Sequence, residues 1–75
     1  MSGTVRWFVD RDDAGIIGRV VRVRDDDEGL HGEYFRAGSW VPDNAVLAVL
    51  QDPGWGLPVT AEEGEAAVAE LQREG

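Results

Sequence analysis

The side chain best suited to acid–base chemistry is His31, the only histidine in this 75-residue chain. A histidine can act as a general base near neutral pH, and Glu33 could orient it. A nucleophile to work with it is missing, because the chain has no cysteine and its serines, Ser2 and Ser39, fall in the N-terminus and in a predicted turn. We therefore predict no catalytic residues and expect that the protein is not an enzyme.

A run of four consecutive acids is the sharpest break in the sequence. It is closed by Gly29, and the mutual repulsion of its carboxylates predicts a solvated loop. Calcium-binding loops are also rich in acids, but they space them differently and end in a distant glutamate. We therefore predict no metal site and no cofactor. The run remains a candidate contact for a protein partner and comprises Asp25, Asp26, Asp27 and Glu28.

Two tryptophans are the best candidates for a binding surface. Tryptophan is enriched at interaction hot spots because it brings a large apolar area with few rotatable bonds. Trp40 follows the predicted turn Arg36–Ser39, and Trp55 lies between glycines in a short apolar loop with Leu57. The alternative is that these side chains belong to the core, since a chain this short needs every large apolar residue for stability. We predict Trp55, Trp40 and Leu57 as partner contacts.

The charge of the chain indicates what kind of partner it would meet. The net charge is −8; residues 1–24 hold five arginines against three aspartates, and residues 25–75 hold two arginines against twelve acids. Such a surface repels nucleic acid and anionic membranes, so we expect neither as a direct partner. The leading hypothesis is a small, acidic, non-catalytic protein-binding module or accessory protein.

The alternative hypothesis is an acidic inhibitor that imitates nucleic acid and binds a basic protein, as phage-encoded antagonists can. It would use the run 25–28 together with acids of the C-terminal helix. The two hypotheses differ in whether the acids cluster on one face or surround the domain.

The location and the assembly of the chain are expectations of the same kind. The N-terminus lacks the basic-then-apolar layout of a signal peptide, and no apolar run approaches the ~20 residues of a membrane span, so we expect a cytoplasmic protein. An exposed edge at a short fourth strand would allow a homodimer.

The alternation of apolar residues predicts an α+β fold in a single small domain, residues 1–75. We expect a three- to four-stranded antiparallel β-meander, followed by a short helix and a C-terminal helix that both pack on one face of the sheet. An SH3-like small barrel with a C-terminal helix is the alternative. The predicted strands cover about residues 4–10, 16–24, 30–36 and 39–41, and the predicted helices cover about 43–51 and 61–73.

Several residues have predicted structural roles within these elements. Asp43 is expected to cap the short helix, and Thr60 with Glu63 to form a capping box for the last helix, in which Gly64 allows close approach. If the first two strands pair with odd register, they place Val5, Trp7 and Val9 on one face with Ile16, Gly18 and Val20. Gly18 within the second strand indicates a β-bulge, or a point where a large side chain such as Trp7 covers the backbone. A further set of arginines is expected to pair with the acids of 25–28 and of the last helix: Arg6, Arg19, Arg22 and Arg24.

Two stretches resemble known protein families. Gly3–Phe8 resembles the first strand of cold-shock domains, but Ile16–Val20 has none of the aromatic RNA-binding residues that follow in that family, so we reject the resemblance. The second set of residues is Tyr34-Phe35, Gly38-x-Trp40-Val41-Pro42-Asp43, Asp52-Pro53 and Thr60-x-Glu62-Glu63. This layout, which spans most of the chain, is similar to small uncharacterised actinobacterial proteins with a strand-rich N-terminal half and a terminal acidic helix. The resemblance implies an α+β fold and transfers no activity.

Overall fold

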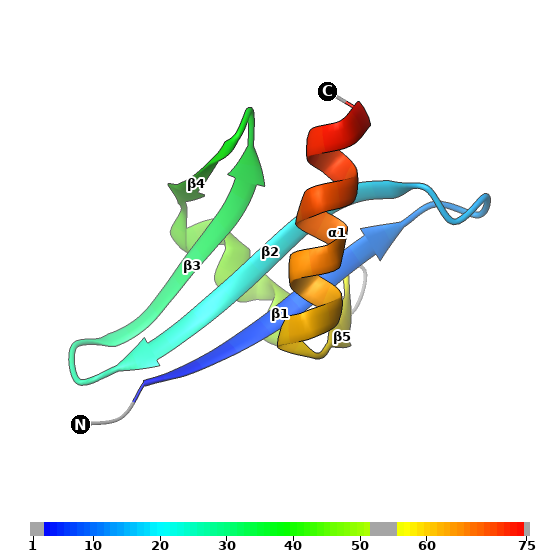
Figure 1. Cartoon of the computed structure of the whole chain (residues 1–75). Coiled ribbons are helices and arrows are strands. Elements are labelled where there is room, and N and C mark those ends of the chain that lie inside the picture. Colours follow the sequence, from blue (N-terminus) through cyan, green and yellow to red (C-terminus); the bar gives the residue numbers. More distant parts are fainter. Residues whose placement is uncertain (1–2, 52–55, 75) are drawn as a thin grey trace.

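A computed structural model describes residues 3–51 and 56–74 of the chain. The described chain has an α+β fold with one five-stranded antiparallel sheet in the order β4-β3-β2-β1-β5, a 3-10 helix and a C-terminal α-helix (Figure 1). The elements are β1 (Thr4–Arg11), β2 (Ile17–Asp26), β3 (Gly29–Arg36), β4 (Ser39–Pro42), η1 (Asn44–Leu50), β5 (Leu57–Val59) and α1 (Ala61–Glu74).

The first four strands form the meander that the alternating pattern predicts. A change of register between Asp10 and Arg11 shifts the start of β2 by one residue. Ile17 therefore turns into the core and is only 7% exposed, whereas Ile16 is 53% exposed. The expectation that Ile16 shares the face of Val9 is wrong, because an irregularity in one strand reverses which neighbour points inward.

The fifth strand was expected to be a loop. Leu57–Val59 instead pairs antiparallel with Trp7–Val9 along the outer side of β1. Pro58 argues against a central strand, but a proline is tolerated at a sheet edge, where its missing N–H faces away from the partner strand. The sheet is open rather than barrel-like, because β4 and β5 are its two opposite edges.

The two helices cover opposite faces of the sheet, which corrects the prediction that both pack on one face (Figure 1). The sheet is apolar on both sides at its centre, since Trp7, Phe8 and Val9 are consecutive and all buried. Under α1 lie the buried residues Trp7, Val9, Ile17, Val20 and Ala67. Under η1 lie the buried residues Phe8, Val21, Val23, Val46 and Val49.

The helix predicted over about residues 43–51 is present and is a 3-10 helix, Asn44–Leu50. Its buried residues, Val46 and Val49, are three positions apart, which matches the three residues per turn of a 3-10 helix. The predicted N-cap is confirmed, since the Asp43 carboxylate accepts a hydrogen bond from the Ala45 N–H at 2.9 Å. The helix is close to β3, where Gly32 is buried beneath it.

The start of α1 confirms the predicted capping box. The Thr60 hydroxyl accepts from the Glu63 N–H at 3.1 Å, and Glu63 Oε1 accepts from the Thr60 N–H at 3.0 Å. Gly64 allows α1 to pack directly on the Trp7 ring, as expected of a close approach. Of the two expectations for Gly18, the bulge is confirmed, since the pairs Asp10–Arg19 and Arg11–Ile17 leave Gly18 without a partner on β1. Trp7 does not cover Gly18, because a Cβ atom there would meet, among the described residues, only Asp10 within 4 Å.

Candidate functional site

The predicted contact residues do not form one surface. Trp40 is on β4 and Leu57 is on β5, at opposite edges of the sheet. Four strand spacings of ~4.8 Å separate these edges, which is about 19 Å. Trp55 lies outside the described residues. Leu57 is 66% exposed, so it is the more accessible of the two described side chains.

Trp40 is partly buried and held firmly by its neighbours. Its ring makes edge-to-face contacts with Trp7 at 5.6 Å and with Phe35 at 5.4 Å between centroids. The guanidinium carbon of Arg22 lies 3.9 Å from the Trp40 ring centroid, a cation–π contact. Nε of Arg22 also donates to Oε1 of Glu33 at 2.7 Å. Trp40 also lines a cleft of about 390 Å³ beside α1, but its main contacts are structural.

The ion pairs of Arg22 and Arg24 are with a glutamate that was not among the predicted partners. The pKa of Asp26 in the acidic run is lowered chiefly by the Glu28 N–H, and the charge of Arg24 also lowers it, as the predicted pairing of Arg24 implies. Arg22 and Arg24 both contact Glu33, and Arg19 contacts Asp10 at 3.5 Å. The register of the sheet explains this, since Arg22 lies directly opposite Glu33 on β3. Arg6 makes no ion pair with any residue that the structure describes, and it is exposed.

The acidic run 25–28 forms the end of β2 and the turn into β3. Asp26 accepts a hydrogen bond from the Glu28 N–H at 2.9 Å and lies 3.1 Å from Nε2 of His31. The Glu28 N–H, followed by His31, lowers the pKa of Asp26 below its ordinary value. The described hydrogen bonds thus join His31 to a carboxylate and to no hydroxyl group.

Sequence reasoning did not anticipate that this turn brings together three groups that could ligate a metal. The donor atoms of Asp26, Glu28 and His31 all lie within 4.8 Å of one another. The sequence signal for this cluster was that Asp26, Glu28 and His31 are two and three residues apart around a predicted loop, which can bring their side chains together. Exposed acidic groups commonly gather without a metal, and the turn's own hydrogen bonds already account for the position of Asp26. We therefore assign no metal to this cluster.

The acids do not gather on one side of the described structure. Asp12 and Asp13 lie near the β1–β2 turn, whereas the run 25–28 lies at the β2–β3 turn (Figure 1). These turns are at opposite ends of β2, a ten-residue strand that is about 33 Å long. Glu62 and Glu63 form a third group, at the start of α1.

One stretch of open backbone lies on β1, next to β5. β5 covers only Trp7, Phe8 and Val9, so the outer side of Thr4–Arg6 has no strand beside it. Pro58 lies opposite Phe8 and has no N–H, so the pairs that face each other with their backbone groups are Trp7–Val59 and Val9–Leu57. The N–H and C=O groups of Trp7 and Val9 therefore point toward β5. Backbone groups of every second residue point to the same side of a strand, so the N–H and C=O of Val5 also point to this side, where no strand that the structure describes lies beside them.

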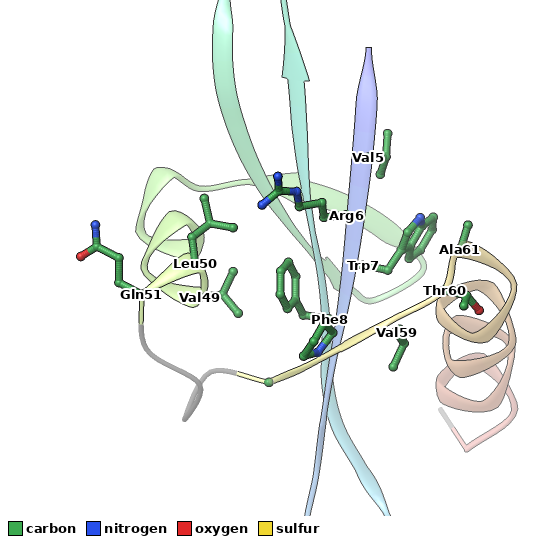
Figure 2. Close-up of a pocket in the computed structure, with 12 residues that line it drawn as sticks. Val5, Arg6, Trp7, Phe8, Val49, Leu50, Gln51, Val59, Thr60 and Ala61 are labelled. Carbon is green, nitrogen blue, oxygen red and sulfur yellow. The ribbon is translucent and has the colours of Figure 1, made fainter. Parts of the chain in front are cut away.

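A groove of about 550 Å³ surrounds this open stretch of β1. Figure 2 shows that its lining side chains divide between the two sides of the strand. Arg6, Phe8, Val49 and Leu50 lie on the side of η1. Val5, Trp7, Val59, Thr60 and Ala61 lie on the side of α1. We call this feature, which includes Val5 and Arg6 of the open stretch, the edge groove.

The edge groove was not predicted from the sequence. Seeing it requires knowing that β5 exists and that it is five residues shorter than the eight-residue β1 beside it. The alternation of β1 was visible, but alternation does not tell which strand lies on the outer side.

Comparison with known proteins adds no family to this description. Searches of family models, of curated proteins and of solved structures each found no match to the chain. The resemblance to small actinobacterial proteins therefore stays a prediction. Among residues 3–51 and 56–74, no helix has the length and the apolar character needed to cross a membrane.

Proposed function

We propose that the protein is a small, acidic, non-catalytic protein-binding module that takes an extended segment of a partner protein as an added strand along Thr4–Arg6. The observation that carries this proposal is the outward-facing backbone of Val5 between two walls that are apolar except for Arg6 and the neutral polar side chains of Gln51 and Thr60. Strand addition uses this combination, because main-chain hydrogen bonds supply affinity and pockets for alternate side chains supply specificity.

The other outer strands offer less open backbone. β5 directs Pro58 outward, and a proline has no N–H to donate. β4 has four residues and ends at Pro42, so it is short and blunted in the way that protects natural sheet edges. The homodimer predicted at β4 stays a prediction and has less support there than strand addition has at Val5.

The exposed apolar side chains of the edge groove also support this function. Val5 is 46% exposed and Leu50 is 37% exposed, one on each side of the strand. An added strand would cover both, at a gain of ~25 cal/mol for each Å² of apolar surface removed from water.

The distribution of the acids favours the binding module over the nucleic-acid mimic. A mimic needs its carboxylates arranged along one surface that a basic cleft can follow. Here Asp12 and Asp13 are separated from the run 25–28 by the length of β2.

Photo-crosslinking in the native host can test the proposed function. A photoreactive amino acid at Leu50, in the edge groove, is expected to capture a partner. The same probe at Ile16, which is exposed at the far end of β1 and β2, is the control and is expected not to.

Two substitutions at Val5 then test strand addition itself. Val5→Pro removes the outward N–H and leaves the ladder between β1 and β2 intact, because that N–H points away from β2. Val5→Thr keeps the N–H and the branched shape of the side chain. We expect capture from Leu50 to be lost with Val5→Pro and kept with Val5→Thr, both variants remaining folded by circular dichroism. Capture that is equal in the two variants would contradict the proposal.

A further inference from the structure

We propose that the partner segment carries a carboxylate side chain that pairs with Arg6, next to an apolar residue that lies opposite Val5. This inference rests on the proposed function, since it names the chemistry of the strand that the edge groove would take.

The charge of the edge groove is the first reason. Among its described lining residues, Arg6 is the only charged side chain, and the others are apolar or neutral. Arg6 makes no ion pair within the described part of the chain. It differs in this from Arg22 and Arg24, which both pair with the Glu33 carboxylate. The edge groove therefore presents one positive charge beside an apolar wall, and the carboxylate that lines a neighbouring cavity together with Arg6, that of Asp25, makes no ion pair with it.

The direction of the side chains is the second reason. Figure 2 shows Arg6 on the same side of β1 as Leu50 and Val49, and Val5 on the side of Ala61. In an added antiparallel strand, the residue opposite Val5 would point toward Ala61, and its neighbour in sequence would point toward Arg6. The predicted recognition pattern is therefore an apolar residue adjacent to an aspartate or a glutamate.

The overall charge of −8 does not favour a basic residue at this position. A distributed negative charge affects the rate of encounter, and it is screened beyond roughly 8 to 10 Å at physiological salt. The contact itself is with a guanidinium, so a lysine or an arginine beside Arg6 would meet a like charge. Contacts of this kind decide which sequences are accepted.

Display of random peptides on phage can test this inference without a known partner. We expect selection on the wild-type protein to enrich peptides with an apolar residue next to an acidic one. Selection on Arg6→Glu should enrich lysine or arginine at the same position, and Arg6→Gln should lose the acidic preference without gaining a basic one. The control is Arg36→Glu, which makes the same charge change at an exposed site far from the edge groove and should keep the wild-type pattern.

A synthetic peptide of the enriched sequence makes the expectation quantitative. We expect Arg6→Glu to weaken its binding at least ~10-fold, which corresponds to about 1.4 kcal/mol. Replacing the acidic residue of the peptide with lysine should reverse the preference between wild type and Arg6→Glu. Titration calorimetry measures both affinities.

The failures of the two proposals are distinguishable. Peptides that require Val5 but show no change of preferred charge with Arg6→Glu would overturn the carboxylate and leave strand addition standing. Peptides that bind wild type and Val5→Pro equally would overturn strand addition itself. A wild-type selection that yields no Val5→Pro-sensitive peptide would overturn both.

Discussion

Gly32 marks the point where the 3-10 helix and the sheet are closest. A Cβ atom there would lie 2.8 Å from Cβ of Val46 and 2.9 Å from the carbonyl oxygen of Asp43. Real Cβ atoms essentially never come that close, and one of the neighbours is backbone at the cap of η1, which cannot rotate away. This residue therefore sets how close the second layer of the core can come.

Gly32→Ala is expected to destabilise the protein by about 2 kcal/mol, in the range of overpacked cores. The matched control is Gly18→Ala, also in a strand, where the nearest described atom is 3.7 Å from the Cβ position. Gly18→Ala should be neutral or slightly stabilising, because alanine reduces the entropy of the unfolded chain. Urea denaturation of both variants measures the difference. Equal stabilities would show that η1 moves to make room.

Individual contacts were predictable only where they are local in sequence. The caps at Asp43 and Thr60 were predicted, because a cap bonds backbone groups two or three residues away. The pairing of Arg22 with Glu33 was not, because it depends on the register of two strands. The bulge at Gly18 was one of two expectations from a glycine inside a strand, but that glycine could not show that Trp7 packs on Gly64 of α1 instead, because this contact depends on how the layers are placed.

At the scale of elements, the start of α1 depends on the ionised form of one carboxylate. The hydrogen bonds from the Thr60 N–H and hydroxyl to Glu63 lower the pKa of Glu63 below its ordinary value. A carboxylate whose pKa is lower in the folded state adds stability above its unfolded pKa. That stability is lost as the pH falls through the folded pKa.

Glu63→Gln is therefore expected to lower the Tm near pH 7, and this effect should shrink as the pH falls through the lowered pKa of Glu63 and the wild-type carboxylate becomes protonated. Glu62→Gln is the control, since it removes the same charge from the same turn, whereas the hydrogen bonds to Thr60 are made by Glu63. Its effect at pH 7 should be smaller. Thermal unfolding followed by circular dichroism across this pH range checks the expectation, and a pH-independent effect of Glu63→Gln would contradict it.

The elements themselves were predictable to different degrees. Apolar and polar residues alternate over several positions in β1 to β4, and turn-forming residues join these strands. Their predicted bounds are therefore close to the observed ones. β5 has three residues, one of them proline, which is too short for a period to be recognised. Its pairing with β1 is a long-range contact, so its own residues carry little sign of it.

At the scale of the molecule, the net charge of −8 acts on stability as well as on binding. Like charges repel across the folded domain, and salt screens this repulsion: the Debye length is about 30 Å at 0.01 M and about 10 Å at 0.1 M. The acids at the two ends of β2 and at the start of α1 are exposed, so they are open to this screening.

We expect the Tm to rise when sodium chloride is raised from ~0.01 M to ~0.3 M. A gain of ~1 kcal/mol would correspond to roughly 4–8 °C for a domain of this size. The double variant Asp25→Asn and Asp27→Asn should have a higher Tm than the wild type at low salt. Its Tm should rise less than that of the wild type when salt is added. Scanning calorimetry measures both. A Tm that falls with salt would show that attractive pairs, such as Arg22 with Glu33, dominate the electrostatics.

The architecture of the whole molecule was predictable as α+β, but the arrangement of its layers was not. The pattern of β1 shows one clear apolar face, and it gave no reason to bury Phe8 as deeply as Trp7. The second layer forms because β2 contributes Val21 and Val23 on that side, where η1 then packs. The edge groove depends on where β5 ends, so it could be found only once the layers were placed.

The contact between Trp7 and Trp40 gives the molecule a built-in optical reporter. The two indoles belong to β1 and β4, strands that are three spacings apart, yet their ring centroids are 5.6 Å apart. Trp7 also lines the edge groove. Indole emission responds to changes in the surroundings of the ring, so occupation of the edge groove would change the intrinsic fluorescence of the protein. Binding at Val5 can thus be followed without attaching any dye.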